Sequence, residues 1–374
     1  MRTAIVHDWI VSSVGGSEKC LAAIHSLFPS PLFTLITNPQ ELKNTYFEKT
    51  EIQSSFIQNL PFSAKKFRNY LPLFPLAIEQ FDLSNFDLIL SSSHCVAKGV
   101  LTHPQQLHIC YCYTPVRYAW DLTYQYLRET KLNRGIKGAL AKFILHYIRN
   151  WDQQASRRVD QFVAISRHVA DRIRKYYGRD AEVIYPPVDT SFFQMETNKE
   201  DYYFTASRFV PYKRIDLIVE AFSEMPEKKL VVLGDGPENE KIRSKAKKNI
   251  EFLGYQPDEE LKKHLQKAKA FVFAANEDFG ILPVEAMACG TPVIAFKQGA
   301  VRETVVEEKT GVFFDEQTVP SLRKAIDQFE TMLHRFSPLE IRRHAEKFDL
   351  SEFNRQFQSF VIDKYQKFSE AKRL

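Results

Sequence analysis

The chain has 374 residues, which is more than one hydrophobic core usually supports, so two domains are expected. Apolar residues at 44% and charged residues at 26% are ordinary for a soluble globular protein. The net charge of +5 comes from scattered cations without a recognised binding module, which argues against nucleic acid as a partner. No run of about eighteen apolar residues occurs, so no transmembrane helix is predicted.

Short apolar runs alternate with helical patterns and predict a βαβα organisation in two halves. In the first half, strands are predicted at residues 4–7, 32–36, 86–90, 107–111, 161–165 and 183–185, with helices such as 17–27 and 167–177 between them. Pro186, Pro187 and the polar stretch to about residue 200 are interpreted as a linker. In the second half, strands are predicted at residues 202–206, 230–233, 250–253, 270–274 and 292–296, each followed by a helix. An amphipathic run over residues 350–368 follows.

The N-terminal residues and the cysteines indicate a cytoplasmic protein. The first strand turns polar at His7 and Asp8, too early for a signal peptide. The five cysteines are odd in number and lack C-x-x-C spacing. Reduced thiols in the cytoplasm are the simplest account of them.

Two glutamates, Glu277 and Glu285, lie in the segment between the predicted strand 270–274 and Gly290. The order is strand, polar loop with Gly280, and then a helix with Pro283 in its first turn. A helix start at the mouth of a sheet favours an anion, because its amides are free and its dipole is positive there. Carboxylates on both sides of such a site could hold the hydroxyls that flank a diphosphate in a nucleotide sugar. Ordinary strand–helix junctions have similar loops.

Two cations occupy the loop after the predicted strand 202–206. Arg208 and Lys213 precede a helix that is predicted to begin near Ile215. A guanidinium group and an ammonium group together can neutralise a diphosphate without a metal ion. Taken singly, each cation would be read as solvated, but their occurrence with the paired glutamates favours a diphosphate site.

These residues resemble the donor-site signature of the retaining glycosyltransferases of family 4. The resemblance covers nearly the whole chain, since Gly15-Gly16, residues 232–237 and residues 299–303 follow in the expected order. It implies an α/β protein of the GT-B fold, in which two Rossmann-like βαβ domains face a central cleft and a C-terminal helix crosses back. The expected domains are an acceptor-side domain over residues 1–190 with the helix 349–374, and a nucleotide-sugar donor domain over residues 200–348.

The resemblance also implies roles for the second half of the chain. Arg208 and Lys213 would stabilise the leaving diphosphate, Glu277 would hold the donor sugar, and Glu285 would hold the ribose. No metal cofactor is expected, because the two cations take its place and no cluster with metal-ligand spacing is visible. Further donor contacts are expected from a glycine turn, a base-contacting tyrosine and the loop at the helix start, namely Gly234, Tyr255, Asp278, Phe279, Gly280, Ile281 and Leu282.

Residues of the first half are expected to face the acceptor and the reacting carbon. Gly15 and Gly16 precede a helix start, where glycine lets backbone amides approach a ligand; a tight turn would explain either glycine equally well. His94 ends an apolar strand at the carboxyl edge of the sheet, where α/β proteins bind ligands. We therefore expect His94 to be catalytic rather than structural.

The segment 108–121 resembles a His-Thr-Pro…Arg-Tyr…Trp-Asp motif of bacterial enzymes that build O-antigen chains and capsules, mannosyltransferases among them. Tyr113 stands where that subgroup usually has histidine, which removes the basis for a catalytic role at this position. Arg117, Tyr118 and Asp121 fit the motif and are expected to bind a sugar acceptor. A rigid aromatic loop over the core is the alternative for Tyr118.

Two stretches mix cations with apolar side chains. Residues 65–75 and 131–145 have the pattern of basic amphipathic segments that lie on anionic lipid. Solvated cations on a helix that packs against the core would give the same pattern. Peripheral contact with the inner face of the cytoplasmic membrane therefore stays open at this point.

The sequence thus predicts a transferase that moves a hexose, with mannose from GDP-mannose as the first choice, to a glycan or lipid-linked glycan acceptor. A GT-B sugar-nucleotide epimerase is an alternative that would need further acids around the sugar. A non-catalytic nucleotide-sugar-binding protein is another, although the intact cations and glutamates argue against it. A dinucleotide oxidoreductase is excluded because no G-x-G-x-x-G follows a strand.

Overall fold

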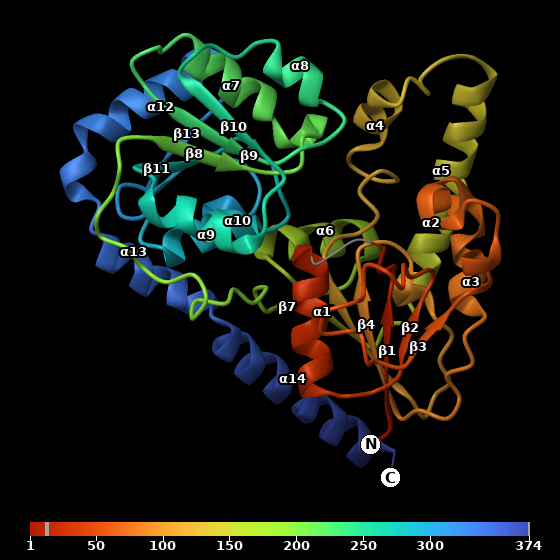
Figure 1. Cartoon of the computed structure of the whole chain (residues 1–374). Coiled ribbons are helices and arrows are strands. Elements are labelled where there is room, and N and C mark those ends of the chain that lie inside the picture. The colour runs from red at the N-terminus through yellow and green to blue at the C-terminus, as the bar shows by residue number, and fades with distance from the viewer. Residues whose placement is uncertain (12–14, 373–374) are drawn as a thin grey trace. The chain divides into compact units, whose positions relative to one another are not determined.

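The computed structural model describes residues 1–11 and 15–372, which divide into two compact units. Unit 1 contains Met1–Pro187 and Phe353–Leu374, and unit 2 contains Val188–Glu352. Each is an α/β unit with a parallel sheet between helices, as the sequence predicted (Figure 1).

The described part of unit 1 forms a seven-stranded parallel sheet in the order β3-β2-β1-β4-β5-β6-β7. Its strands are β1 (Thr3–His7), β2 (Leu32–Thr34), β3 (Ile52–Ser54), β4 (Leu88–Ser93), β5 (Leu107–Cys112), β6 (Gln161–Ala164) and β7 (Ala181–Val183). Strands β1, β4 and β5 are almost wholly buried and consist mainly of apolar or small residues, as expected for strands covered on both faces.

Helices cover both faces of this sheet. In Figure 1, α1 and α14 lie on one side of it and α2, α3 and α5 on the other. Phe357 of α14 packs against Phe28 at the end of α1 and against Tyr111 of β5, with ring centroids 6.3 and 5.6 Å apart. The helices and 3-10 turns of this unit are α1 (Gly16–Leu27), η1 (Phe56–Asn59), α2 (Ser63–Lys66), η2 (Phe67–Leu73), α3 (Phe74–Glu79), η3 (Ala97–Gly99), α4 (Thr123–Glu129), α5 (Gly135–Ser156), α6 (Arg167–Tyr177) and α14 (Leu350–Ala371), whose first residues belong to unit 2.

Unit 2 forms a six-stranded parallel sheet in the order β10-β9-β8-β11-β12-β13. Its strands are β8 (Tyr203–Ala206), β9 (Leu230–Leu233), β10 (Ile250–Gly254), β11 (Ala270–Phe273), β12 (Val293–Phe296) and β13 (Gly311–Phe314). Its helices and 3-10 turns are η4 (Pro211–Lys213), α7 (Ile215–Ser223), α8 (Asn239–Arg243), α9 (Asp258–Lys267), α10 (Ile281–Ala288), α11 (Val301–Thr304), α12 (Val319–Thr331), η5 (Leu333–Arg335), α13 (Pro338–Ala345) and η6 (Glu346–Phe348).

Both sheets reverse their strand order at one point, between β1 and β4 in unit 1 and between β8 and β11 in unit 2. In open α/β sheets, ligands bind beyond the carboxyl ends of the strands at such a switch point. The residues that follow these four strands are therefore the first candidates for a functional site. Among the described residues, no helix combines the length and the apolar character needed to cross a bilayer.

Candidate active site

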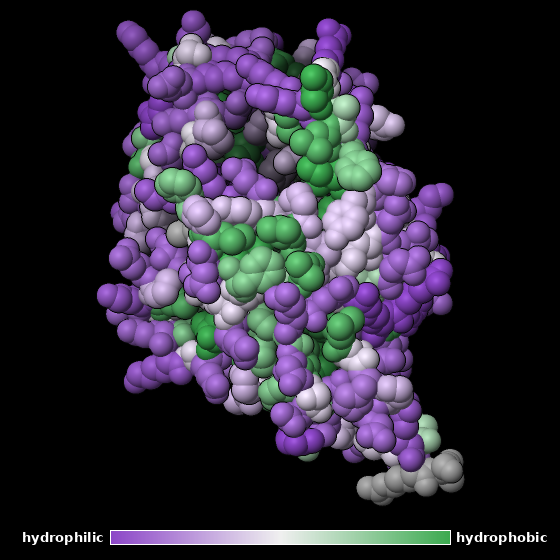
Figure 2. All heavy atoms as spheres, turned by 90° about the vertical axis from the view of Figure 1, so that its right-hand side faces the viewer, coloured by the Kyte–Doolittle hydropathy of each residue, from purple (hydrophilic) through white to green (hydrophobic). Residues whose placement is uncertain are grey.

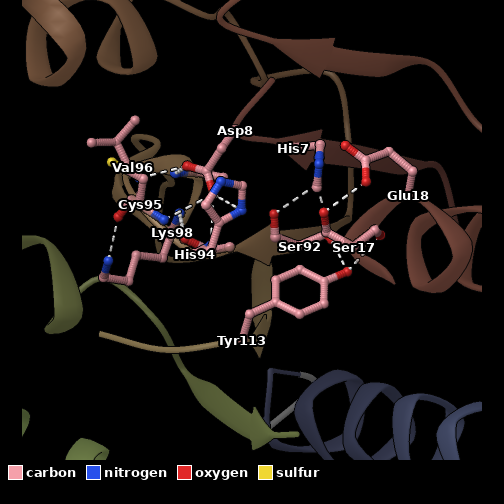
Figure 3. Close-up of polar contacts among 12 residues, drawn as sticks. His7, Asp8, Ser17, Glu18, Ser92, His94, Cys95, Val96, Lys98 and Tyr113 are labelled. Carbon is pink, nitrogen blue, oxygen red and sulfur yellow. Dashed lines mark hydrogen bonds and ion pairs between the residues drawn. The ribbon is translucent and has the colours of Figure 1, made fainter. Parts of the chain in front are cut away.

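At the switch point of unit 1, the carboxylate of Asp8 is held by four backbone amides of the turn after β4 (Figure 3). His94 and Cys95 donate to its Oδ2 at 2.6 and 2.9 Å, and Val96 and Ala97 donate to its Oδ1 at 2.5 and 2.7 Å. Burial alone would raise the pKa of Asp8, but the adjacent histidines and the amide hydrogen bonds outweigh burial and hold this pKa below its usual value. A charged Asp8 thus locks the turn that carries His94.

The side chain of His94 lies directly beside this carboxylate. Its Nδ1 is 3.1 Å from Oδ2 of Asp8, and its ring meets the ring of Trp9 edge-on with centroids 4.4 Å apart. Burial lowers the pKa of His94, and the charges of Lys98 and Arg68 add to this effect against the attraction of Asp8. The side chain is still 25% exposed. A neutral, oriented imidazole at the carboxyl end of β4 can exchange hydrogen bonds with a hydroxyl of a ligand.

The hydroxyl of Tyr113 contacts two groups of the protein near this point. It donates to the carbonyl oxygen of Ser17 at 3.0 Å and lies 2.9 Å from Oγ of Ser92 (Figure 3). Burial raises the pKa of Tyr113 well above its ordinary value, so the phenol stays neutral. Tyr113 therefore ties β4 to the start of α1, which is a structural task.

The glycines before α1 are arranged differently from our expectation. The amide of Gly15 donates to Oε2 of Glu18 at 3.1 Å, and Oγ of Ser17 donates to the same oxygen at 2.8 Å. Gly16 is the first residue of α1. The carboxylate of Glu18 thus takes the amide that was predicted to face a ligand.

The loop between β5 and α4 carries the other acceptor-side candidates, Arg117, Tyr118 and Asp121. Asp121 forms an ion pair with Arg172 at 2.6 Å, and the hydroxyl of Tyr118 lies 2.9 Å from Sγ of Cys95. Tyr118 also packs against the apolar core of the unit. The structure therefore gives Tyr118 and Asp121 internal contacts, which is the arrangement of a rigid loop.

At the switch point of unit 2, Lys213 and Glu277 come together. Lys213 ends η4, after β8, and Glu277 follows β11. Nζ of Lys213 donates to Oε1 of Glu277, and each side chain is about one-fifth exposed. Arg208, in the same loop as Lys213, is exposed to solvent. The structure thus brings a carboxylate and two cation-bearing positions to one edge of the sheet.

Glycines hold these loops in place. Gly234 has φ +131°, and a Cβ there would overlap the carbonyl oxygen of Ser207, next to Arg208. Gly299 has φ +78°, and a Cβ there would lie 2.5 Å from the carbonyl oxygen of Glu277. The amide of Ala300 donates to that same oxygen at 3.0 Å. Only glycine permits both close approaches without strain, so these residues position Arg208 and Glu277.

The helix after Glu277, α10, begins at Ile281, so Pro283 lies in its first turn as the sequence predicted. Gly280 precedes it with φ +81°, and Leu282 lies in its first turn. Asp278 and Phe279 complete the loop, with the ring of Phe279 buried and 5.9 Å from that of Phe348. Phe279 can therefore offer a ligand its backbone only.

Two further donor-side candidates differ sharply in exposure. Glu285 lies on α10 and is only 3% exposed, whereas Tyr255 follows β10 and is 75% exposed. A buried carboxylate near a helix start can accept hydrogen bonds from ligand hydroxyls without competition from bulk water. An exposed tyrosine at a strand end presents a flat face on which a base can stack. Within residues 1–11 and 15–372, no group of three or more His, Cys, Asp and Glu side chains is placed to hold a metal ion.

Comparisons with known proteins place this geometry in a family. Residues 188–340 match the model for glycosyl transferases group 1, and residues 34–192 match the model for glycosyltransferase family 4. Together the two models span residues 34–340, so most of the chain is similar to glycosyltransferases of these families. The GT-B fold predicted from the sequence is thereby confirmed.

Related sequences include several mannosyltransferases. The chain is 29% identical over 198 residues to a GDP-mannose-dependent alpha-(1-6)-phosphatidylinositol monomannoside mannosyltransferase of Mycolicibacterium smegmatis, covering 45% of this chain and 52% of that protein. It is 28% identical over 206 residues to the O-antigen chain mannosyltransferase RfbU of Salmonella typhimurium, covering 51% of this chain and 58% of that protein. These matches thus span about half the length of the curated relatives.

Solved structures support the fold over nearly the whole chain. Sucrose-phosphate synthase of Thermosynechococcus elongatus superposes with a TM-score of 0.75 at 16% identity, covering 98% of this chain and all of that one. Anabaena HepE, crystallised in complex with UDP, gives a TM-score of 0.70 at 16% identity and covers 97% of this chain and all of that one.

Proposed function

We propose that this protein is a retaining hexosyltransferase that moves mannose from GDP-mannose to a glycan or lipid-linked glycan acceptor in the synthesis of a cell-surface polysaccharide. The observation that carries the proposal is the meeting of Lys213 and Glu277, with Arg208 nearby, at the switch point of unit 2. The names of the mannosyltransferase relatives support mannose as the sugar and GDP-mannose as the donor.

The donor would bind to unit 2 through complementary charge. Arg208 and Lys213 would face the diphosphate, and the amides at the start of α10 would add to the positive field. Negative charge grows on the diphosphate as it leaves, so these fixed cations stabilise the transition state more than the ground state. Glu285 would hold the ribose, Glu277 the sugar, and Tyr255 the base.

The acceptor would bind to unit 1. His94 would hydrogen-bond a hydroxyl of the transferred sugar or of the acceptor. The loop of Arg117, Tyr118 and Asp121, held rigid by the internal contacts of Tyr118 and Asp121, would form the acceptor side. Retention requires the acceptor oxygen to bond to the anomeric carbon on the face from which the phosphate oxygen leaves. The acceptor proton then passes to that phosphate oxygen, which is the base nearest to the new bond.

We also propose a cytoplasmic location and independence from a metal cofactor. The five cysteines are all free and buried, which suits a reducing compartment. The two cations supply the charge that a divalent ion would otherwise supply.

The decisive experiment incubates the protein with GDP-mannose, GDP-fucose, UDP-glucose and UDP-galactose and follows the nucleotide products by mass spectrometry. We expect GDP from GDP-mannose, with less than a tenth of that rate in the R208A variant. Release of UDP from UDP-glucose or UDP-galactose would instead show that the donor carries uridine and a sugar other than mannose. An epimerised sugar nucleotide would identify an epimerase, and unchanged donors that nonetheless bind would identify a binding protein.

A further inference from the structure

Helix α5 of unit 1 exposes a line of large apolar side chains to solvent. Ile136 is 91% exposed and Phe143 69%, and Leu140 and Tyr147 are exposed with them. With about 3.6 residues per turn, these four positions fall on one side of the helix. Exposed apolar side chains that gather on one surface are typical of a binding site rather than of a solvated helix.

The opposite side of α5 packs against the body of unit 1. Gly138, Leu145 and Ile148 are buried there, and Ile148 belongs to a small core cluster with Val116 and Ala119. The exposed line is therefore not needed to attach the helix. The exposed apolar side of α5 is thus left over for a partner outside the core of unit 1.

The charges beside the exposed line are all positive. Lys137 and Lys142 are exposed and lie on either side of the apolar line. Around the helix axis, Lys137 is about 100° from Ile136 in one direction and Lys142 is about 120° from it in the other. No Asp or Glu occurs between Glu129 and Asp152. Over the whole chain, by contrast, the 51 Lys and Arg are nearly balanced by 46 Asp and Glu.

A second segment, residues 56–79, also combines exposed apolar side chains with cations and no carboxylates before Glu79. From η1 to α3, the apolar Phe62, Leu73 and Leu76 are exposed, and so are the cations Lys65, Lys66 and Arg68. No Asp or Glu occurs between Glu51 and Glu79.

The two segments are in contact through α5 and η2. Leu71 of η2 and Ile144 of α5 pack against the same core cluster. Figure 2 views the molecule from the side on which Figure 1 places α2, α3 and α5, and it shows apolar side chains gathered on this face with hydrophilic ones around them. We call the exposed apolar side chains and cations of these two segments the α5 face.

We propose that the α5 face binds the surface of an anionic lipid bilayer. Ile, Leu and Phe side chains would enter the boundary between head groups and acyl chains, and Lys and Arg would pair with anionic head groups. A second copy of the chain is a poor occupant, because two faces with cations and no carboxylates repel each other. A nucleic acid would pair with the cations but gain nothing from the aliphatic side chains.

The proposal is tested by flotation of the purified full chain with two kinds of vesicle, phosphatidylcholine alone and phosphatidylcholine mixed with phosphatidylglycerol. We expect binding to the anionic vesicles only, and weaker binding at high salt. The double variant K137Q/K142Q should lower the partition coefficient on the order of 20-fold, since each lysine near an anionic surface contributes about fivefold. The double variant I136S/F143S should lower it at least as much.

Matched controls come from unit 2. The variants L339S and K324Q change an exposed leucine and an exposed lysine outside the α5 face and should bind vesicles as the unaltered protein does. All variants should keep the wild-type thermal transition, which shows that both units have folded, and wild-type affinity for a free nucleoside diphosphate, which reports on unit 2. Absence of binding to anionic vesicles would overturn the proposal, as would equal binding by the α5-face variants. A dimer in solution that I136S/F143S dissociates, without vesicle binding, would assign the face to a second copy instead. The test does not depend on which sugar is transferred.

Discussion

Lys213 and Glu277 form an ion pair in unit 2 although 64 positions separate them in the chain. The pair brings together the loop after β8 and the loop after β11, the two strands at which the sheet reverses its order. In this state the ammonium charge that we assign to the diphosphate is already neutralised by a carboxylate. A donor must therefore draw Lys213 away from Glu277, or share it.

The variant E277Q tests this competition. It keeps the shape of the side chain but removes the charge, so Lys213 becomes more available to phosphate. We expect the affinity for free GDP to rise, on the order of fivefold, because a partly exposed ion pair is worth up to about 1 kcal/mol. The rate of sugar transfer should fall, because the contact to the sugar is weakened. Calorimetry and a transfer assay on one preparation measure both, and weaker GDP binding would show that the pair does not compete with the donor.

Removal of either cation should act mainly on the chemical step. R208A and K213A each delete charge that matters most as the diphosphate departs, so kcat should fall by roughly 100-fold or more. Steady-state kinetics with the donor identified by mass spectrometry provide the measurement. K263A, at an exposed lysine of α9, is the matched control. Near-normal turnover by both variants would remove the assignment of this loop to the diphosphate.

Glu285 is buried on α10, so its role can be separated from mere packing by an isosteric change. E285Q should bind GDP about tenfold more weakly, because hydrogen bonds from ligand hydroxyls to a charged acceptor are among the stronger ones. The thermal transition should stay close to that of the unaltered protein. Unchanged GDP affinity together with a lower melting temperature would instead make Glu285 a structural residue.

His94 belongs to unit 1, whereas the donor-side candidates all belong to unit 2. H94A should therefore leave GDP affinity unchanged and lower the transfer rate, by roughly 100-fold if the imidazole contacts the reacting sugar. The same residue lies against Trp9, so the melting temperature must be recorded as a control. Transfer at the wild-type rate would make His94 a structural histidine.

Metal dependence offers a simple test of how the leaving group is stabilised. Full transfer activity should survive an excess of EDTA, because Arg208, Lys213 and the start of α10 supply the positive charge. The measurement is the transfer rate before and after dialysis against the chelator. A loss of activity that Mg²⁺ or Mn²⁺ restores would contradict the prediction.

The sequence predicts the fold well where a strand is a buried apolar run. The strand at β9 and the helix at α6 have the predicted limits, because Leu230–Leu233 is apolar throughout and Arg167–Tyr177 follows the capping residue Ser166 and ends at Gly178. Strand β3 was missed, because Ile-Gln-Ser is a short edge strand with little apolar character. Strand β13 was missed because it is only four residues long and begins with a glycine.

The sequence predicts the functional site less completely, because contacts between distant segments decide it. The four amides that bind Asp8 come from residues 86 to 89 positions away, and nothing in the local pattern of Asp8 shows this. Lys98 and Asp152 form a fully buried ion pair at 2.6 Å, although isolated charges in a sequence are usually read as solvated. The capping of α1 by Glu18 could have been predicted, because Glu18 lies three residues after Gly15, as in a capping box.

The chain path makes unit 2 an insertion within unit 1. Its two ends lie side by side, since the amide of Val188 donates to Phe348 at 2.9 Å and the amide of Leu350 donates back to Val188 at 3.1 Å. During synthesis, unit 2 can therefore fold as soon as it leaves the ribosome. In unit 1, Tyr111 and Phe28 stay uncovered until Phe353 and Phe357 of α14 have been synthesised. A chain that stops at residue 352 would keep an intact unit 2 and leave an open apolar patch on unit 1, prone to aggregation and to capture by chaperones.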